Sequence, residues 1–312
     1  MPKKKKKRTK DRSRLFQRME FFLFIPFLKL IPWIPSFICK TLALSISFMI
    51  FRFAKGRRKI TLDNLSVVFP KWDRKKIIFT GKQSTLSFVM TAVESLKYNK
   101  ILNGPKALPF IQENFCNFDV FNERVNFFHR ESDGCIFIVP HLGNWEFLLH
   151  AGTIAGIPLT VPVRNLDNPY LQKSLHKIRS NSGQEIVSKR GVLLNIRSSL
   201  KKGRSVALLA DQNVGSSGEN IPFFGKNAST TITPAFFALN LNRAIVPLAC
   251  CRSVEDKKFV LMIGNPIYPS KEVSSRRKEI IEMTIKLNEE LEKFILQFPG
   301  QYLWAHDRWK IK

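Results

Sequence analysis

Short, continuous runs of apolar residues alternate with helical stretches from residue 135 to the end of the chain. Five of these runs have the length of strands and lie at residues 135–139, 159–163, 206–210, 244–251 and 259–263. Apolar residues recur at helical spacing in the stretches that separate and follow them, residues 145–155, 168–182, 193–202, 233–242 and 278–297. Strands that are apolar on both faces are typical of a buried, mostly parallel sheet covered by helices. The pattern predicts a single α/β domain with a largely parallel or mixed central sheet flanked by helices.

The N-terminal part of the chain has a different character. Residues 1–20 form a basic tail, and residues 21–55 are strongly apolar and aromatic, interrupted by Lys29, Lys40 and three prolines. This segment fits a signal peptide poorly and predicts a membrane anchor, either a span or hairpin whose lysines reach the headgroups or an element lying in one leaflet. Basic residues on both flanks favour the in-plane or re-entrant form. We expect a helical lead-in over residues 56–100, broken at Pro70, before the α/β core of residues 100–312.

The charge balance indicates which partners the protein meets. Lys and Arg number 51 against 24 Asp and Glu, a net charge of +27, so the surface attracts anions. A nucleic-acid partner leaves the apolar anchor unexplained, and no RNA-recognition or helix-turn-helix signature is present. We therefore expect an anionic membrane and no nucleic acid. The five cysteines have no metal-knuckle spacing, and Cys250-Cys251 reads as a pair of buried thiols in a strand, as in a protein from a reducing compartment.

The first predicted strand runs into Pro140 and a His-x-x-x-x-Glu pattern formed by His141 and Glu146, at the start of a helix. Sites in open α/β sheets form outside the carboxyl ends of strands. A neutral imidazole can remove the proton of an alcohol near pH 7, and a carboxylate on its other nitrogen fixes the tautomer. The alternative, a core histidine and an unrelated surface glutamate, does not explain this context. The sequence predicts His141 as general base and Glu146 as the residue that orients it, without metal or nucleophilic serine.

At this point the chain resembles a known family. Residues His141 to Glu146, HLGNWE, resemble the first motif of the lysophospholipid acyltransferase superfamily, in the form carried by the lipid A late acyltransferases of the lauroyl/myristoyl branch. Further blocks match in order: Asn64-Leu65 with Phe69-Pro70, then Glu94, then Arg164, Asn165, Asn168, Pro169, Arg179 and Gly183, then Asp211-Gln212 with Phe223-Phe224-Gly225, Ala228 and Thr231, and finally PGQYLWAHDRWK over residues 299–310. Gly300, Asp307 and Thr233 depart from the family pattern and leave the acceptor open.

The resemblance implies an enzyme that moves a fatty acyl group from acyl-acyl-carrier protein to a hydroxyl of a phosphorylated lipid A precursor. It implies direct attack on the thioester with no cofactor, on the cytoplasmic side of the bacterial inner membrane. An acidic carrier protein suits the positive charge of the chain. The alternative is acylation of another membrane glycolipid or a lysophospholipid, with acyl-coenzyme A as donor. A catalytically dead scaffold is a further alternative, against which the intact His141 and Glu146 argue.

Five residues complete the predicted site as substrate-binding groups: Arg164, Asn144, Asp211, Gln212 and Arg179. Arg164 follows a strand, and its guanidinium either pairs with a phosphate or forms a structural salt bridge. Asp211 ends a strand, and Gln212 follows it into a loop.

Two other residues, His306 and Arg308, lie in the aromatic and basic C-terminal block. We expect them to pack against the domain or to contact anionic headgroups, and not to take part in the chemistry. Gly143 is expected to let a substrate approach the backbone closely.

Overall fold

The computed structural model describes residues 14–163, 168–172, 183–188, 191–253, 255, 258–270 and 275–310. Its centre is a six-stranded sheet with the order β3-β2-β4-β1-β7-β8. The strands are β1 (Ile136–Ile138), β2 (Leu159–Val163), β3 (Glu185–Ser188), β4 (Ser205–Leu208), β7 (Ile245–Arg252) and β8 (Phe259–Ile263). Every neighbouring pair is parallel except β7 and β8, which are antiparallel. The predicted α/β class and the largely parallel, mixed sheet are confirmed.

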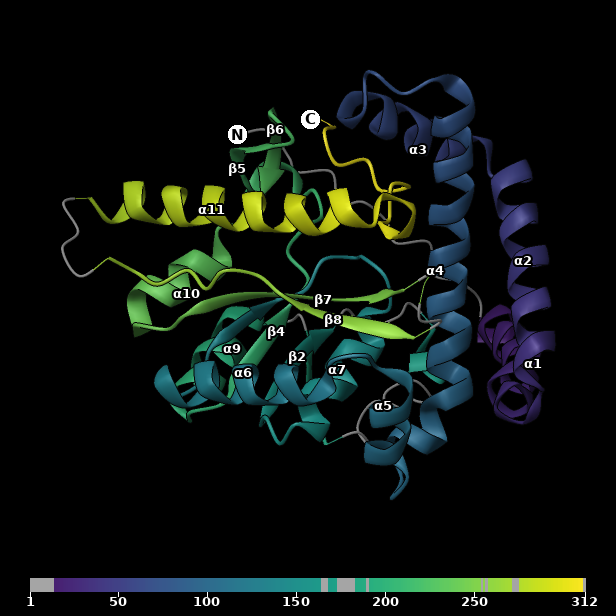
Figure 1. Ribbon diagram of the computed structural model, residues 1–312, viewed down its shortest axis with the longest axis horizontal. Coiled ribbons are helices and arrows are strands. Elements are labelled where there is room, and N and C mark those ends of the chain that lie inside the picture. The colour runs from purple at the N-terminus through teal and green to yellow at the C-terminus, as the bar shows by residue number, and fades with distance from the viewer. Residues whose placement is uncertain are drawn as a thin grey trace.

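Helices cover both faces of the sheet, with α11 (Arg276–Gln297) on one side and α6 (Phe118–Glu131) and α7 (Trp145–Ile154) on the other (Figure 1). Strand β1 shows why the strands are apolar throughout, because its side chains pack against the helices on both faces of the sheet. Ile136 and Ile138 belong to the cluster that includes α11, while Phe137 belongs to the cluster that includes α6 and α7. Side chains alternate between the faces of a strand, so a strand buried on both faces must be apolar throughout.

Shorter elements complete the α/β part: α5 (Ala107–Asn114), α9 (Val192–Lys201), α10 (Thr233–Leu241) and the 3₁₀ turns η2 (Gly215–Ser217) and η3 (Pro299–Gln301). A two-stranded antiparallel hairpin of β5 (Glu219–Phe223) and β6 (Lys226–Thr230) stands apart from the main sheet, on the side of α11 (Figure 1). The sequence pattern predicted neither this hairpin nor β3, α5 and α6. The predicted helix over residues 168–182 lies mostly outside the described residues.

The lead-in consists of α1 (Arg14–Leu30), the turn η1 (Ile31–Trp33), α2 (Ser36–Phe53), α3 (Lys55–Val68) and α4 (Arg74–Leu102), with the predicted break at Pro70 between the last two. The carboxylate of Asp73 caps α4 by accepting from the Lys76 amide at 2.7 Å. Helix α4 stands across the edge of the α/β part, and α2 runs alongside it on its outer side (Figure 1). The N-terminal helices are therefore packed onto the domain through α4.

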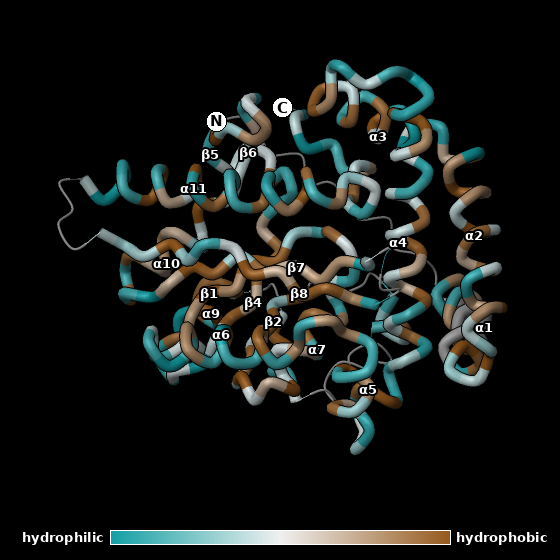
Figure 2. The backbone as a smooth tube through the Cα atoms, viewed as in Figure 1, coloured by the Kyte–Doolittle hydropathy of each residue, from teal (hydrophilic) through white to brown (hydrophobic). Residues whose placement is uncertain are grey.

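Helix α2 is long and apolar enough to cross a membrane by length and composition, and only 17% of that window is buried. Its large outward side chains include Phe37, Phe48 and Phe53, which are 71%, 64% and 64% exposed. Hydrophobic residues recur along α1 and α2 at the outer edge of the molecule (Figure 2). An exposed apolar surface of this extent marks contact with a membrane or a partner, which agrees with the anchor expected over residues 21–55.

Candidate active site

His141 and Asp211 meet because the strands that precede them are neighbours. His141 follows β1, and Asp211 follows β4, which pairs in parallel with β1. Their carboxyl ends therefore lie at the same edge of the sheet, although 70 residues separate them in the chain. Nδ1 of His141 lies 2.7 Å from Oδ1 of Asp211, and the backbone N–H of His141 donates to Oδ2 at 2.8 Å. Both carboxylate oxygens are thus used to hold one residue.

The surroundings of Asp211 keep its carboxyl ionised. Asp211 is 2% exposed. Burial by itself raises its pKa, but the charge and the two hydrogen bonds of His141, with a contribution from Arg308, outweigh burial and lower the pKa below its ordinary value. An ionised carboxylate only accepts hydrogen bonds, so Nδ1 of His141 carries the proton and Nε2 presents its lone pair.

His141 lines a largely apolar cavity. The side-chain amide nitrogen of Gln212 lies 3.4 Å from Nε2 of His141. The ring of Trp145 packs edge-on against the imidazole, with 5.3 Å between the ring centres. The cavity has a volume of about 440 Å³. Its polar walls are His141, Glu146, Gln184, Gln212, Thr231 and Thr233, and the rest of its lining is apolar. Such a space suits a hydrocarbon chain with its reactive end at the imidazole.

Glu146, which the sequence paired with His141, lines the same cavity. The hydrogen bond on Nδ1 belongs to Asp211, which the sequence had placed among the substrate-binding residues. The structure places Asp211 in contact with His141, and its contact with substrate stays a prediction. Only the order of the strands could have revealed the contact with His141, because Asp211 lies 70 residues away in the chain.

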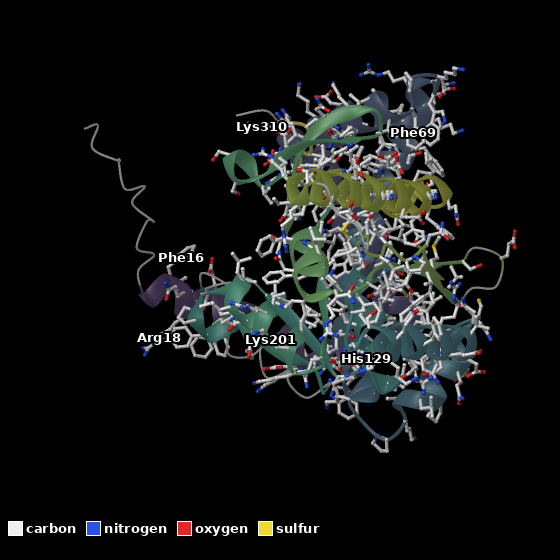
Figure 3. All side chains as sticks on the ribbon, turned by 90° about the vertical axis from the view of Figure 1, so that its left-hand side faces the viewer. Phe16, Arg18, Phe69, His129, Lys201 and Lys310 are labelled. Carbon is white, nitrogen blue, oxygen red and sulfur yellow. The ribbon has the colours of Figure 1, made fainter. Side chains whose placement is uncertain are left out.

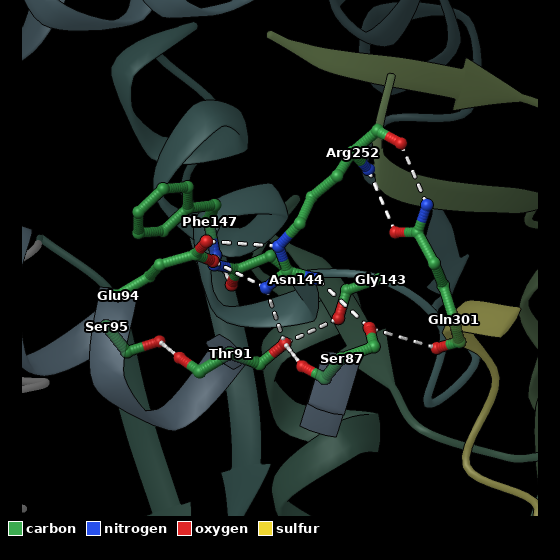
Figure 4. A network of polar contacts seen from close by, with 9 residues as sticks. All are labelled: Ser87, Thr91, Glu94, Ser95, Gly143, Asn144, Phe147, Arg252 and Gln301. Carbon is green, nitrogen blue, oxygen red and sulfur yellow. Dashed lines mark hydrogen bonds and ion pairs between the residues drawn. The ribbon is translucent and has the colours of Figure 1, made fainter. Parts of the chain in front are cut away.

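Asn144 is the N-cap of α7 and is fully buried. Its side-chain oxygen accepts from the amide of Phe147 at 3.0 Å, and its amide group donates to Glu94 of α4 at 2.8 Å. Both ends of the side chain are engaged in holding the loop after His141, so the structure gives Asn144 a positioning role (Figure 4).

A polar network extends from this loop to α4, β7 and the C-terminal block (Figure 4). Arg252 at the end of β7 forms an ion pair with Glu94, and it donates to Ser87 and Thr91 at 3.0 Å each. Thr91 in turn donates to the carbonyl oxygen of Gly143 at 2.7 Å. The side chain of Gln301 bonds the backbone N–H and carbonyl of Arg252 at 2.9 and 2.8 Å. Arg252 was not predicted as a site residue, since no motif contains it.

Gly143 has a role in the backbone that the sequence did not predict, and close approach of a substrate stays a prediction. Its φ is +60°, and a Cβ at this position would lie 2.0 Å from the carbonyl oxygen of Cys250. The neighbouring amide, that of Asn144, donates to the same carbonyl at 2.7 Å. Only glycine allows the loop to run this close to β7. Cys250 and Cys251 are buried in β7, as predicted.

The C-terminal block, residues 299–310, packs beside Asp211. Tyr302 is buried, and burial and the neighbouring Asp211 carboxylate raise its pKa, so its hydroxyl keeps its proton. Arg308 is 2% exposed and donates to the carbonyl of Ser229 and the hydroxyl of Thr230 at 2.6 and 2.7 Å. His306 accepts the backbone N–H of Asn213 on Nε2 at 2.8 Å. The expectation that His306 and Arg308 pack against the domain is confirmed.

Two of the predicted substrate-binding residues, Arg164 and Arg179, lie outside the described residues and stay predictions. Within the same block, Asn168 donates to the Gln17 carbonyl of α1 at 2.8 Å, and Arg18 donates to the hydroxyl of Tyr170 at 3.2 Å. Arg18 and Phe16 mark this end of α1 in Figure 3, far from Lys310 of the C-terminal block. The second sequence block of the family resemblance, which includes Asn168, thus contacts α1.

Comparisons with known proteins identify the family to which the sequence is similar. The family model described as bacterial lipid A biosynthesis acyltransferase matches residues 6–311. The chain is 26% identical over 167 residues to the lipid A biosynthesis palmitoleoyltransferase of Escherichia coli strain K12, covering 52% of each chain. It is 22% identical over 187 residues to the phosphatidylinositol mannoside acyltransferase of Mycolicibacterium smegmatis, covering 56% of this chain and 57% of that protein. These matches therefore span about half the length of the curated relatives.

Proposed function

The chain belongs to the bacterial lipid A biosynthesis acyltransferase family, and we propose that it transfers a fatty acyl chain to a hydroxyl of a lipid A precursor. The observation that carries this proposal is the hydrogen-bonded pair of His141 and Asp211 at the wall of an apolar cavity of about 440 Å³. The pair supplies a general base, and the cavity supplies room for the acyl chain beside it.

In the proposed reaction, Nε2 of His141 takes the proton of the acceptor hydroxyl as its oxygen bonds to the thioester carbonyl carbon. The tetrahedral intermediate then collapses, the carbon–sulfur bond breaks, and the departing thiolate receives the proton from His141. An ester and a free thiol result, with no covalent acyl-enzyme. Asp211 stabilises the imidazolium during this exchange and holds the ring in the required tautomer.

We keep Glu146 in the catalytic set because it lines the cavity together with His141. The orienting role proposed for it from the motif and the role that the Nδ1 contact suggests for Asp211 can be separated by experiment. Loss of the carboxylate that orients His141 should lower kcat. Loss of a carboxylate that only lines the cavity should change KM as well, because it alters how substrate is held.

The proposed donor is acyl-acyl-carrier protein. A net charge of +27 favours encounter with an acidic carrier protein, and acyl-coenzyme A is the alternative donor. Gln212, Arg164 and Arg179 remain proposed substrate-binding residues, with the two arginines as candidates for phosphate contacts. No metal or cofactor is needed for the steps above.

The proposed location is the bacterial inner membrane, with the catalytic domain on the cytoplasmic side. The exposed apolar surface of α2 and the basic residues around it support this placement. Fractionation tests it: an anchored protein stays with membranes in high salt, while a protein held by charge alone is released.

A second acceptor class is supported by one of the relatives. The Mycolicibacterium protein is named for acylating a phosphatidylinositol mannoside, and it matches this chain over a similar length as the Escherichia coli protein. The alternative proposal is therefore acylation of a different membrane glycolipid by the same chemistry.

The test is acyl transfer by purified membranes supplied with acyl-acyl-carrier protein and a tetra-acylated, Kdo-bearing lipid A precursor. Wild type should transfer the acyl group, and His141→Ala should not. If wild type leaves this precursor untouched but acylates a mannosylated phosphatidylinositol, the second acceptor class is correct. Near-normal transfer by folded His141→Ala would refute the proposed mechanism.

A further inference from the structure

Three cavities follow one another from α2 to His141. The first is a groove of about 1020 Å³ between α2, α3 and α4, and it shares Phe51 and Arg58 with a second cavity of about 330 Å³. The second shares Gln212 with the cavity of about 440 Å³ that contains His141. Because adjoining cavities share wall residues, a ligand of several parts can lie across all three.

The middle cavity carries positive charge. Arg57 and Arg58 line it, and none of the described residues that line it is a carboxylate. In the part of the chain that the structure describes, their guanidiniums donate only to backbone carbonyls, Arg57 to Ala305 at 3.2 Å and Arg58 to Phe51 at 3.5 Å among them. Both retain N–H groups for an anion, since a guanidinium has five.

His306 adds a neutral donor to the same cavity. Its Nε2 accepts the backbone N–H of Asn213, so the ring proton lies on Nδ1. Burial lowers the pKa of His306, which favours this neutral form. The charge of Asp211 reaches His306, but Asp211 is 2% exposed and both of its carboxylate oxygens accept from His141. Two guanidiniums and an imidazole N–H match the oxygens of a phosphate.

The outer groove is lined by both apolar and basic side chains. Its apolar lining includes Phe48, Leu62, Ile77, Phe79 and Leu86. Its charged lining residues are Arg52, Lys55, Arg58, Lys59, Asp63, Arg74 and Lys82, and the single acid among them pairs with Lys59 at 3.0 Å. A lining of apolar and basic side chains, next to the exposed apolar face of α2, suits an anionic amphiphile that comes from a membrane.

We propose that these cavities bind the acceptor. Its existing acyl chains lie in the outer groove, a phosphate contacts Arg57 and Arg58, and the hydroxyl passes Gln212 to reach Nε2 of His141. The side-chain amide of Gln212, 3.4 Å from Nε2, moves aside when the hydroxyl arrives. The acyl chain of the donor occupies the innermost cavity. This assignment rests on the proposed function, which it extends to phosphorylated, already acylated glycolipids.

The test is equilibrium binding of the tetra-acylated lipid A precursor to the purified full chain in a neutral detergent, with no donor present. The double variant Arg57→Gln/Arg58→Gln should raise Kd about tenfold or more, because it removes charge-assisted hydrogen bonds. Removal of the phosphates from the precursor should weaken binding to wild type and abolish the difference between wild type and variant. Arg57→Lys/Arg58→Lys should recover part of the affinity, since it restores the charge.

The matched control is Arg130→Gln, another exposed arginine that lines none of the three cavities. Arg130 lies on α6 next to His129, and Figure 3 shows His129 at the opposite end of the molecule from Phe69, which follows α3. The control should bind like wild type. A second variant, Thr85→Trp, fills the middle cavity from a half-buried position and should also weaken binding.

Equal Kd values for wild type and the folded double variant would overturn the inference. So would a loss of the same size for the dephosphorylated precursor, since the arginines would then not contact its phosphates. Addition of acyl-acyl-carrier protein to the same samples tests the proposed function separately. Phosphate-dependent binding without transfer by wild type would refute the reaction and leave the binding site standing.

Discussion

Asp211→Asn gives a sharp test of the pairing at His141, because the change keeps the shape of the side chain. In wild type, the two carboxylate oxygens accept from the backbone N–H and from Nδ1 of His141, at 2.8 and 2.7 Å. The backbone N–H can only donate, so the asparagine oxygen must face it. The amide nitrogen of the asparagine then faces Nδ1, which must accept. The ring proton moves to Nε2, and the base is lost.

The expected magnitude follows from this change of tautomer. Replacing the orienting aspartate by asparagine in a comparable triad lowers kcat by about 10⁴-fold, so we expect a loss of about 10³- to 10⁴-fold here. That corresponds to about 4–5.5 kcal/mol in the activation free energy. The assay is initial-rate acyl transfer at saturating donor and acceptor, with near-wild-type thermal unfolding as evidence that the variant is folded.

The comparison with Glu146→Gln decides between the two carboxylates. If Asp211 orients the base, Glu146→Gln should retain more kcat than Asp211→Asn and should show its effect in KM as well. A folded Asp211→Asn enzyme with more than about a tenth of wild-type kcat, far above the loss expected from the wrong tautomer, would refute the reasoning. A loss confined to Glu146→Gln would return the orienting role to the motif glutamate.

Three further variants test the supporting structure. Arg252→Ala leaves Glu94 buried without its ion-pair partner, so it should lower the free energy of unfolding by about 3–5 kcal/mol. Denaturant titration in detergent measures this loss, and a loss under about 1 kcal/mol would contradict the stabilising role of the network. Gly143→Ala should prevent folding or abolish activity, because its Cβ would meet the Cys250 carbonyl. Gly156 is the control: its φ is +85°, but a Cβ there would have nothing within 4 Å, so Gly156→Ala should cost only about 1–2 kcal/mol of backbone strain. Wild type should lose stability as the pH falls below about 6.5, since unfolding lets His306 take up a proton that its lowered pKa in the fold disfavours. His306→Gln keeps an acceptor for the Asn213 amide and should flatten that part of the pH profile; an unchanged slope would assign it to other groups.

The sequence predicted those parts of the fold that depend on local patterns. Continuous apolar runs identified β1, β2, β4, β7 and β8 of the main sheet, because a strand buried on both faces needs no polar residues. The hairpin of β5 and β6 escaped prediction because its strands are partly exposed and contain polar residues such as Asn220 and Lys226, so no apolar run marks them. The position of His141 at the end of β1 was likewise predictable, since the motif and the strand are contiguous.

The partner of that histidine was not predictable, for a physical reason. Asp211 comes to His141 only because β4 pairs with β1 while β2, which lies between them in the chain, is placed on the far side of β4. This order is a property of tertiary packing, and the sequence near either residue does not encode it. The motif therefore pointed to Glu146, the carboxylate nearest in sequence. Arg252 was not predicted as a site residue for the same reason, because its contacts with α4 join segments that are distant in the chain.

Helix α4 links the proposed membrane contact to the chemistry. On its outer side it packs along α2, whose apolar face is exposed (Figure 1). On its inner side, Thr91 bonds the carbonyl of Gly143 and Glu94 bonds the side chain of Asn144, the two residues that shape the loop after His141. The same helix contributes Ser84, Thr85 and Phe88 to the middle cavity. One rigid element thus sets the position of the base relative to the α2 surface. An acceptor drawn from a membrane at α2 would meet His141 along a fixed path, which a flexible linker between anchor and domain could not provide.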